Sequence, residues 1–231
     1  MGSRFQGHIL EPDDDGYYEA RQVWNAMVDK RPALIACCLD TDDVVTALAL
    51  ARGRGLEISV RGGGHSIVGH SVTEGGLMVD LSLINDVRID PDARYVAVGG
   101  GALWADIDRA SLPLGLAVTG GMVSHTGVAG LTLGGGYGWL ARRHGLSCDN
   151  LLSAEVVTAA GEVLPASEDE NEELLWGLRE GAEISASSPG SSFVCTSSTG
   201  SASPSTSSTR PRTAATSCTP SRSSQPRRPT R

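Results

Sequence analysis

Hydrophobic and polar positions in the first sixty residues predict a helix, a strand, a second helix and a second strand. Apolar side chains recur at helical spacing over residues 15–30, which predicts an amphipathic helix. Residues 33–38 are continuously apolar, as in a strand buried on both faces. Residues 40–43 supply capping and acidic side chains ahead of a helix over 44–51, and residues 57–60 form the next strand. This order predicts a βαβ unit with two parallel, paired strands.

The pattern becomes less regular after residue 60. Short apolar runs predict further strands, residues 102–110 and 168–179 have amphipathic helical spacing, and Ala160 and Gly161 mark a tight turn between two strands. The predicted strands are residues 77–81, 95–98, 151–158 and 162–164. These elements, joined by glycine-rich connections, predict an α+β fold.

Residues 182–231 have a different composition. They contain 16 Ser, 8 Thr and 6 Pro with no apolar periodicity, so they cannot bury enough apolar surface to offset the entropy of ordering. We therefore expect a disordered tail. It has six arginines against the single acidic Glu183, which raises the alternative of an RNA-associated tail. The acidic remainder of the chain, and the lack of stacking aromatics beyond Phe193, argue against nucleic-acid binding.

Composition also bears on the cellular location of the protein and on which kinds of site to expect. The chain has no run of 18 apolar residues, and residues 1–12 lack the apolar core of a signal peptide, so we expect a cytoplasmic protein without a membrane partner. The five cysteines are odd in number and lack C-x-x-C spacing. Reduced thiols are expected, with neither a disulfide framework nor a metal site.

The first chemical motif is Arg61-Gly62-Gly63-Gly64-His65-Ser66, directly after a predicted strand. Three glycines let backbone N–H groups approach a diphosphate closely. The motif lacks the Gly-Lys-Ser/Thr of a Walker loop and the G-x-G-x-x-G of a Rossmann site. His65 could act as a nucleophile through a ring nitrogen. The alternative is a tight turn with an incidental histidine.

The second motif is glycine-rich and runs over residues 119–138. Small side chains at this density predict a surface for a flat cofactor, and Thr126 could cap a short helix that faces an anion. Close packing of a helix on a sheet also needs small residues and is the alternative. The positions of interest are Gly120, Gly121, Ser124, Thr126, Gly127, Gly130 and Gly134.

Together with residues 145–158, the two motifs resemble the PCMH-type FAD-binding domain of the vanillyl-alcohol-oxidase family, in its berberine-bridge-like branch. The resemblance covers residues 31–181. It implies a domain of two α/β subdomains, with the glycine loop on the FAD pyrophosphate, His65 bonded to the flavin 8α carbon, and Val157 beside the cofactor. Residues 122–125 contain no cysteine, so a second flavin bond is not expected. A related branch, the aminosugar-nucleotide reductases, binds FAD without a covalent bond.

The resemblance implies an FAD-dependent oxidoreductase that oxidises an alcohol, a sugar or a related C–H donor, with a small molecule as its substrate. The catalytic residues and the oligomeric state are not indicated by the sequence. The alternative is a fragment that binds flavin without catalysis, or one that misfolds. The expected division is an incomplete FAD-binding domain over residues 1–181, followed by the tail.

The tail has a second interpretation. In the family, the helix that ends in Leu-Arg precedes a Gly-Gly-Gly-Asn-Phe-Gly type of segment. Codons can be chosen for residues 181–199 whose reading one base out of step begins Gly-Gly-Asn-Phe-Gly-Ile-Val-Thr-Arg-Phe-Glu. The sequence therefore predicts that the tail is out of frame and that the substrate domain is missing.

Overall fold

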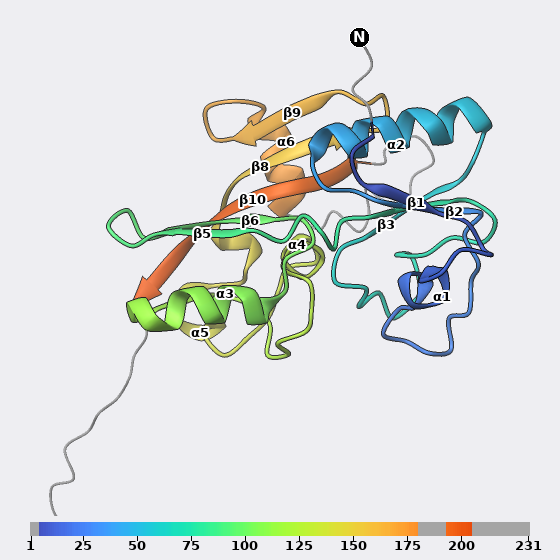
Figure 1. Cartoon of the computed structure of the whole chain (residues 1–231). Coiled ribbons are helices and arrows are strands. Elements are labelled where there is room, and N and C mark those ends of the chain that lie inside the picture. Colours follow the sequence, from blue (N-terminus) through green and yellow to red (C-terminus); the bar gives the residue numbers. More distant parts are fainter. Residues whose placement is uncertain (1–4, 180–192, 205–231) are drawn as a thin grey trace, which may run out of the picture.

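The computed structural model describes residues 5–179 and the backbone of residues 193–204. Two sheets lie side by side (Figure 1). The first has four strands in the order β1-β2-β4-β3, in which β1 is antiparallel to β2, and β4 is parallel to both β2 and β3. Its strands are β1 (His8–Leu10), β2 (Leu34–Cys37), β3 (Ile58–Arg61) and β4 (Leu77–Asp80).

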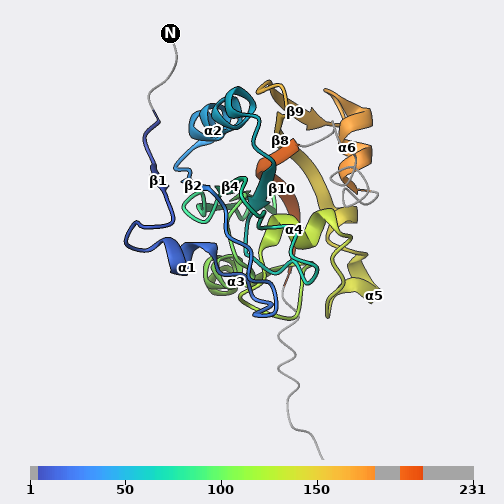
Figure 2. The ribbon, with the colours of Figure 1, turned by 90° about the vertical axis from the view of Figure 1, so that its right-hand side faces the viewer.

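Helices cover both faces of the first sheet (Figures 1 and 2). Helix α2 (Thr41–Arg54) begins at Asp40, whose side chain accepts a hydrogen bond from the Asp43 N–H, and ends at Gly55 with a φ of 65°. It packs on one face of β2 and β4, and α1 (Tyr17–Arg21) packs on the other. The predicted βαβ unit is present with one correction, because β4 separates β2 from β3.

The second sheet is antiparallel, with the order β5-β6-β10-β8-β9 and with β7 also paired to β10. The strands are β5 (Val87–Asp90), β6 (Tyr95–Gly99), β7 (Leu116–Val118), β8 (Leu151–Thr158), β9 (Val163–Ser167) and β10 (Phe193–Pro204). Its helical elements are α3 (Trp104–Ser111), α4 (Val128–Leu133), α5 (Ala141–His144), α6 (Glu172–Arg179), and the 3-10 turns η1 (Leu112–Leu114) and η2 (Cys148–Asn150). The predicted α+β class is confirmed. Within the described ranges, no helix has the length and apolarity needed to span a membrane.

Helix α2 also joins the two sheets. Val157 on β8 is fully buried in the same core cluster as the residues of α2, β2 and β4. The Thr41 hydroxyl donates to the Glu155 carboxylate at 2.7 Å, which links the start of α2 to β8. The two sheets therefore share one core along this helix.

The predicted helix over residues 15–30 is largely wrong. Only α1 forms, and the chain is extended at Gln22, so that Trp24 and Met27 are exposed instead of facing a core. Tertiary hydrogen bonds hold the extended segment: the Trp24 N–H donates to the Gly64 carbonyl, and the Asn25 side chain donates to the Ile67 carbonyl. These bonds to the glycine loop override the helical spacing.

The expectation of a tail without structure is corrected over residues 193–204. Strand β10 pairs with β6 on one side and with β8 on the other. Both neighbours offer a row of backbone donors and acceptors, and pairing with them does not depend on side chains. Residues 182–192 and 205–231 lie outside the described part of the chain, so the prediction of disorder there is untested.

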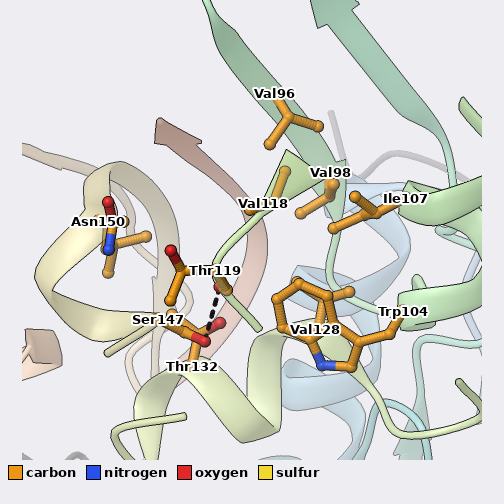
Figure 3. A pocket seen from close by; sticks show the side chains of 11 residues that line it. Val96, Val98, Trp104, Ile107, Val118, Thr119, Val128, Thr132, Ser147 and Asn150 are labelled. Atoms are coloured by element: carbon orange, nitrogen blue, oxygen red, sulfur yellow. Dashed lines mark hydrogen bonds between the residues drawn. The ribbon is translucent and has the colours of Figure 1, made fainter. Parts of the chain in front are cut away.

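A small cavity of about 30 Å³ lies in the core of the second sheet (Figure 3). Val96, Val98, Trp104 and Ile107 line its apolar side, and the Ser147 hydroxyl donates to the Thr119 carbonyl at its polar side. This volume suits about one water molecule and cannot hold a nucleotide. By register, Gly200 and Ser198 of β10 pair with Val96 and Val98 of β6.

Candidate functional site

A second cavity, of about 280 Å³, lies where the glycine loop meets the second half of the chain. It collects residues from the loop after β3, the segment after β4, the turn before α3 and the segment before α4. The lining residues are Arg61, Gly62, Gly63, Ser82, Asn85, Gly101, Leu103, Asp106 and His125. This volume lies near the lower end of ligand sites and accommodates the phosphate part of a dinucleotide better than a whole one.

Glycine backbones form one wall of this cavity because there is no room for side chains. A Cβ on Gly62 would lie 2.9 Å from the Gly100 carbonyl oxygen, and a Cβ on Gly63 would lie 2.2 Å from the backbone nitrogen of Gly127. Gly64 has a φ of 69°, a conformation that L side chains rarely adopt. The loop thus presents bare backbone, which suits an oxyanion such as a diphosphate.

Arg61 anchors the loop to the first sheet. Its guanidinium donates to the Asp80 carboxylate at 3.0 Å and to the Ala20 carbonyl at 3.1 Å. Asp80 is buried, and its other oxygen accepts the Ser82 N–H. The Nε atom of Arg61 is buried without a partner among the described residues. The arginine therefore fixes the loop and retains one free donor, which fits a site for an anionic group.

His65 lies between two other rings. The Trp24 indole stacks on it with ring centroids 5.3 Å apart and an interplanar angle of 21°. On its other side, His65 Nε2 lies 2.6 Å from His125 Nδ1, and the Thr126 hydroxyl lies 3.5 Å from His65 Nδ1. Burial, and secondarily the charge of His125, lower the pKa of His65, so that the neutral, nucleophilic form persists below the usual pH range of histidine.

The structure brings part of the predicted set to the cavity. Arg61, Gly62 and Gly63 line it. Gly64, His65, Thr126 and Gly127 adjoin it through contacts within this group. The expected cap by Thr126 is wrong, because Gly127 holds the N-cap position of α4 and no side chain bonds there.

The other predicted positions have different surroundings. A Cβ on Gly120 or Gly121 would meet the side chains of Trp104 or Leu131, so both glycines serve close packing. Ser66 and Ser124 accept hydrogen bonds within their own turns or from α3, and Gly130 and Gly134 lie exposed on and after α4. The Val157 side chain is buried in the shared core and does not line the cavity.

Several lining residues were not predicted from the sequence. Ser82 and Asn85 follow β4. The carboxyl ends of parallel strands are where open α/β sheets bind ligands, and that rule would have indicated these two residues. His125 lies next to the predicted glycine-rich cofactor surface, but the sequence did not assign it a role. Trp24, which stacks on His65 without lining the cavity, has no comparable signal, because only the folded chain brings it there.

Comparison with known proteins agrees with this geometry. The family model described as "FAD binding domain" matches residues 32–167. The chain is 41% identical over 174 residues to (R)-6-hydroxynicotine oxidase of Paenarthrobacter nicotinovorans, covering 75% of this chain and 38% of that one. It is 36% identical over 183 residues to an FAD-linked oxidoreductase of Aspergillus terreus, covering 78% and 37%.

Solved structures give the same result. The crystal structure of 6-hydroxy-D-nicotine oxidase from Arthrobacter nicotinovorans superposes with a TM-score of 0.81 at 38% identity, covering 86% of this chain and 42% of that one. Glucooligosaccharide oxidase from Acremonium strictum, which has a 6-S-cysteinyl, 8α-N1-histidyl FAD, gives a TM-score of 0.76 at 31% identity, covering 85% of this chain and 40% of that one. The chain thus spans about two fifths of the length of these relatives.

Proposed function

Because the chain belongs to the FAD-binding domain family of the FAD-linked oxidoreductases, we propose that it carries FAD covalently on His65 and serves the oxidation of an alcohol, a sugar or a related C–H donor. The family assigns FAD as the cofactor. The covalent bond and the substrate class are the proposal. The rival within the fold is FAD held without a bond, as in the aminosugar-nucleotide reductase branch.

The observation that carries the proposal is the position of His65 directly after the three glycines. The loop backbone and the unpartnered Arg61 Nε suit the pyrophosphate. The His65 ring contacts His125, which lines the same cavity. The chain resembles glucooligosaccharide oxidase over 40% of that protein's length, and that protein has a histidyl FAD. When bound, FAD supplies the acceptor for a hydride from a substrate carbon.

The described residues have defined tasks toward this cofactor. Gly62 and Gly63 would offer backbone N–H groups to the phosphates, and Ser82 and Asn85 would offer polar side chains to the same region. His65 would fix the flavin end. Positioning accounts for a large part of hydride-transfer rates, so a fixed flavin is useful only together with a pocket for the substrate.

The test is acid denaturation of the purified protein. We expect flavin to remain with the polypeptide, with an added mass of one FAD, and His65→Ala to lose both signals. His70→Ala, an exposed histidine five residues later, is the matched control and should keep them. Acid-released flavin in the wild type would contradict the covalent bond.

Turnover is tested separately with 6-hydroxynicotine, oligosaccharides and simple alcohols. Reduction of the bound flavin by one of these supports the oxidase proposal and identifies the substrate class. Acid-stable flavin that no C–H donor reduces would favour the alternative, flavin binding without catalysis.

A further inference from the structure

Three aromatic rings from three separate segments meet at His65. Trp24 comes from the extended segment after α1, His65 from the glycine loop, and His125 from the segment before α4. The two imidazole centroids are 4.6 Å apart and tilted by 40°, so the contact between them is through their edges. The indole fixes one face of His65, and His125 meets one of its ring nitrogens.

The contact of 2.6 Å between His65 Nε2 and His125 Nδ1 constrains the protons of both rings. Two N–H groups or two lone pairs would repel at this distance, so one proton lies between the nitrogens. When His65 donates through Nε2, its Nδ1 retains a lone pair. The Thr126 hydroxyl lies 3.5 Å from that nitrogen, at the outer limit of a hydrogen bond, so it competes only weakly for the lone pair.

We propose that His125 is the proton acceptor that makes His65 a nucleophile toward the flavin. The inference rests on the proposed function, in which His65 carries FAD. The bond from His65 Nδ1 to the flavin 8α carbon forms as one C–H bond of that methyl group and the Nε2–H bond of His65 break. His125 Nδ1 takes the Nε2 proton, so that the alkylated ring is left neutral. The two electrons go to the flavin and then, with two protons, to dioxygen, which leaves as hydrogen peroxide.

Among the described residues near His65, the other charged groups are engaged in interactions of their own, so His125 is the available proton acceptor. Arg61 is committed to the Asp80 carboxylate. Asp106 lines the same cavity, but its two oxygens accept from the Leu103 N–H and from Arg109. Burial and the charge of His125 lower the pKa of His65, which disfavours the doubly protonated pair that would block the reaction.

The proposal is tested by the rate at which flavin-free protein acquires acid-stable flavin from added FAD. His125→Gln should attach flavin roughly 10²-fold more slowly, in the range of general-base effects, when both proteins are compared at FAD concentrations that saturate the non-covalent complex. In His125→Gly, free imidazole should restore part of the rate, which a merely structural role would not permit. The wild-type rate should fall as the pH drops and the pair takes up a second proton.

Two further measurements separate the possible failures. ¹⁵N NMR of the flavin-free protein should show a proton shared between His65 and His125; two rings that titrate independently would overturn the proposal. Attachment by His125→Gln at the wild-type rate would overturn the role of His125 and leave the proposed function standing. Absence of acid-stable flavin in the wild type would overturn the proposed function itself.

Discussion

Gly63 and Gly127 touch through their backbones: a Cβ on Gly63 would lie 2.2 Å from the Gly127 nitrogen, and a Cβ on Gly127 would lie 2.5 Å from the Gly63 nitrogen. The contact joins the loop after β3 to the start of α4. It explains why two glycine-rich motifs, distant in the sequence, are both needed at one site. Neither backbone can yield as a flexible side chain would, so the contact is intolerant of substitution.

Gly63→Ala should therefore destabilise the protein by about 3 kcal/mol, the upper end of overpacking effects, and should reduce flavin incorporation. Gly130→Ala is the control, because a Cβ there meets nothing within 4 Å and α4 would gain about 0.5–1 kcal/mol. Urea unfolding and flavin content measure both variants. Equal stability of the two variants would contradict the contact.

The Arg61–Asp80 ion pair gives a second prediction. Asp80→Ala should cost about 3–5 kcal/mol, because it leaves the arginine without its charged partner beside a buried strand end. The double variant Arg61→Met/Asp80→Leu should recover most of that loss in a double-mutant cycle, although it should lose affinity for FAD. Additive single effects would show that the two groups do not interact.

Asp43 should contribute more to the stability of the protein than its neighbour Asp42. Its buried carboxylate accepts hydrogen bonds from the backbone N–H groups of Gln6, Gly7 and Leu39 at 2.7–3.0 Å. Asp43→Ala leaves these donors without an acceptor, and we expect a loss of about 3 kcal/mol in the free energy of unfolding. Asp42→Ala, on the exposed side of the same turn, should cost less than about 1 kcal/mol.

The buried thiols predict a pH dependence at the alkaline end. Burial, and secondarily Asp80, raise the pKa of Cys37 from 9.0 to about 11. Between these values the unfolded thiol has lost its proton and the native one has not, so stability should fall as the pH rises from about 9 to 11. In urea unfolding between pH 8 and 11, the free energy of unfolding of Cys37→Ala should fall less steeply with pH than that of the wild type. If the free energy of unfolding depended on pH equally in both proteins, the Cys37 thiol would be in contact with water and not buried.

A fifth prediction concerns the gene. The nucleotides after the Gly181 codon, read one base out of step, should encode Gly-Gly-Asn-Phe-Gly-Ile-Val-Thr-Arg and should continue in family-like sequence. DNA sequencing decides this directly. A downstream frame that meets early stop codons would contradict it.

The membership in the FAD family, predicted from the order of the glycine motifs, is confirmed by the family model and the superpositions. The first sheet was predictable because β2, α2 and β3 are local units with their own caps and apolar runs. The pairing of β4 between β2 and β3 was not, since strand order depends on contacts between distant segments.

The residues of the candidate site also fall into those that the sequence predicted and those that it did not. Arg61, Gly62 and Gly63 could be identified because a backbone that must approach a ligand needs glycine, and glycine is visible in a sequence. Trp24 had the spacing of a buried helix face, and His125 lay near the predicted cofactor surface without an assigned role. Hydrogen bonds and stacking formed only in the folded chain decide both positions.

Strand β10, in the middle of the second sheet, is the last strand among the described residues, and this affects the order of folding. Residues 8–80 contain every strand of the first sheet, which can therefore form before the rest of the chain has been synthesised. Pairing of Ser197 with Gly99 closes a long loop and must wait until β10 has left the ribosome. Until then β6 and β8 present open edges to other chains. The yield of folded protein should therefore respond to chaperone supply more than its final stability does.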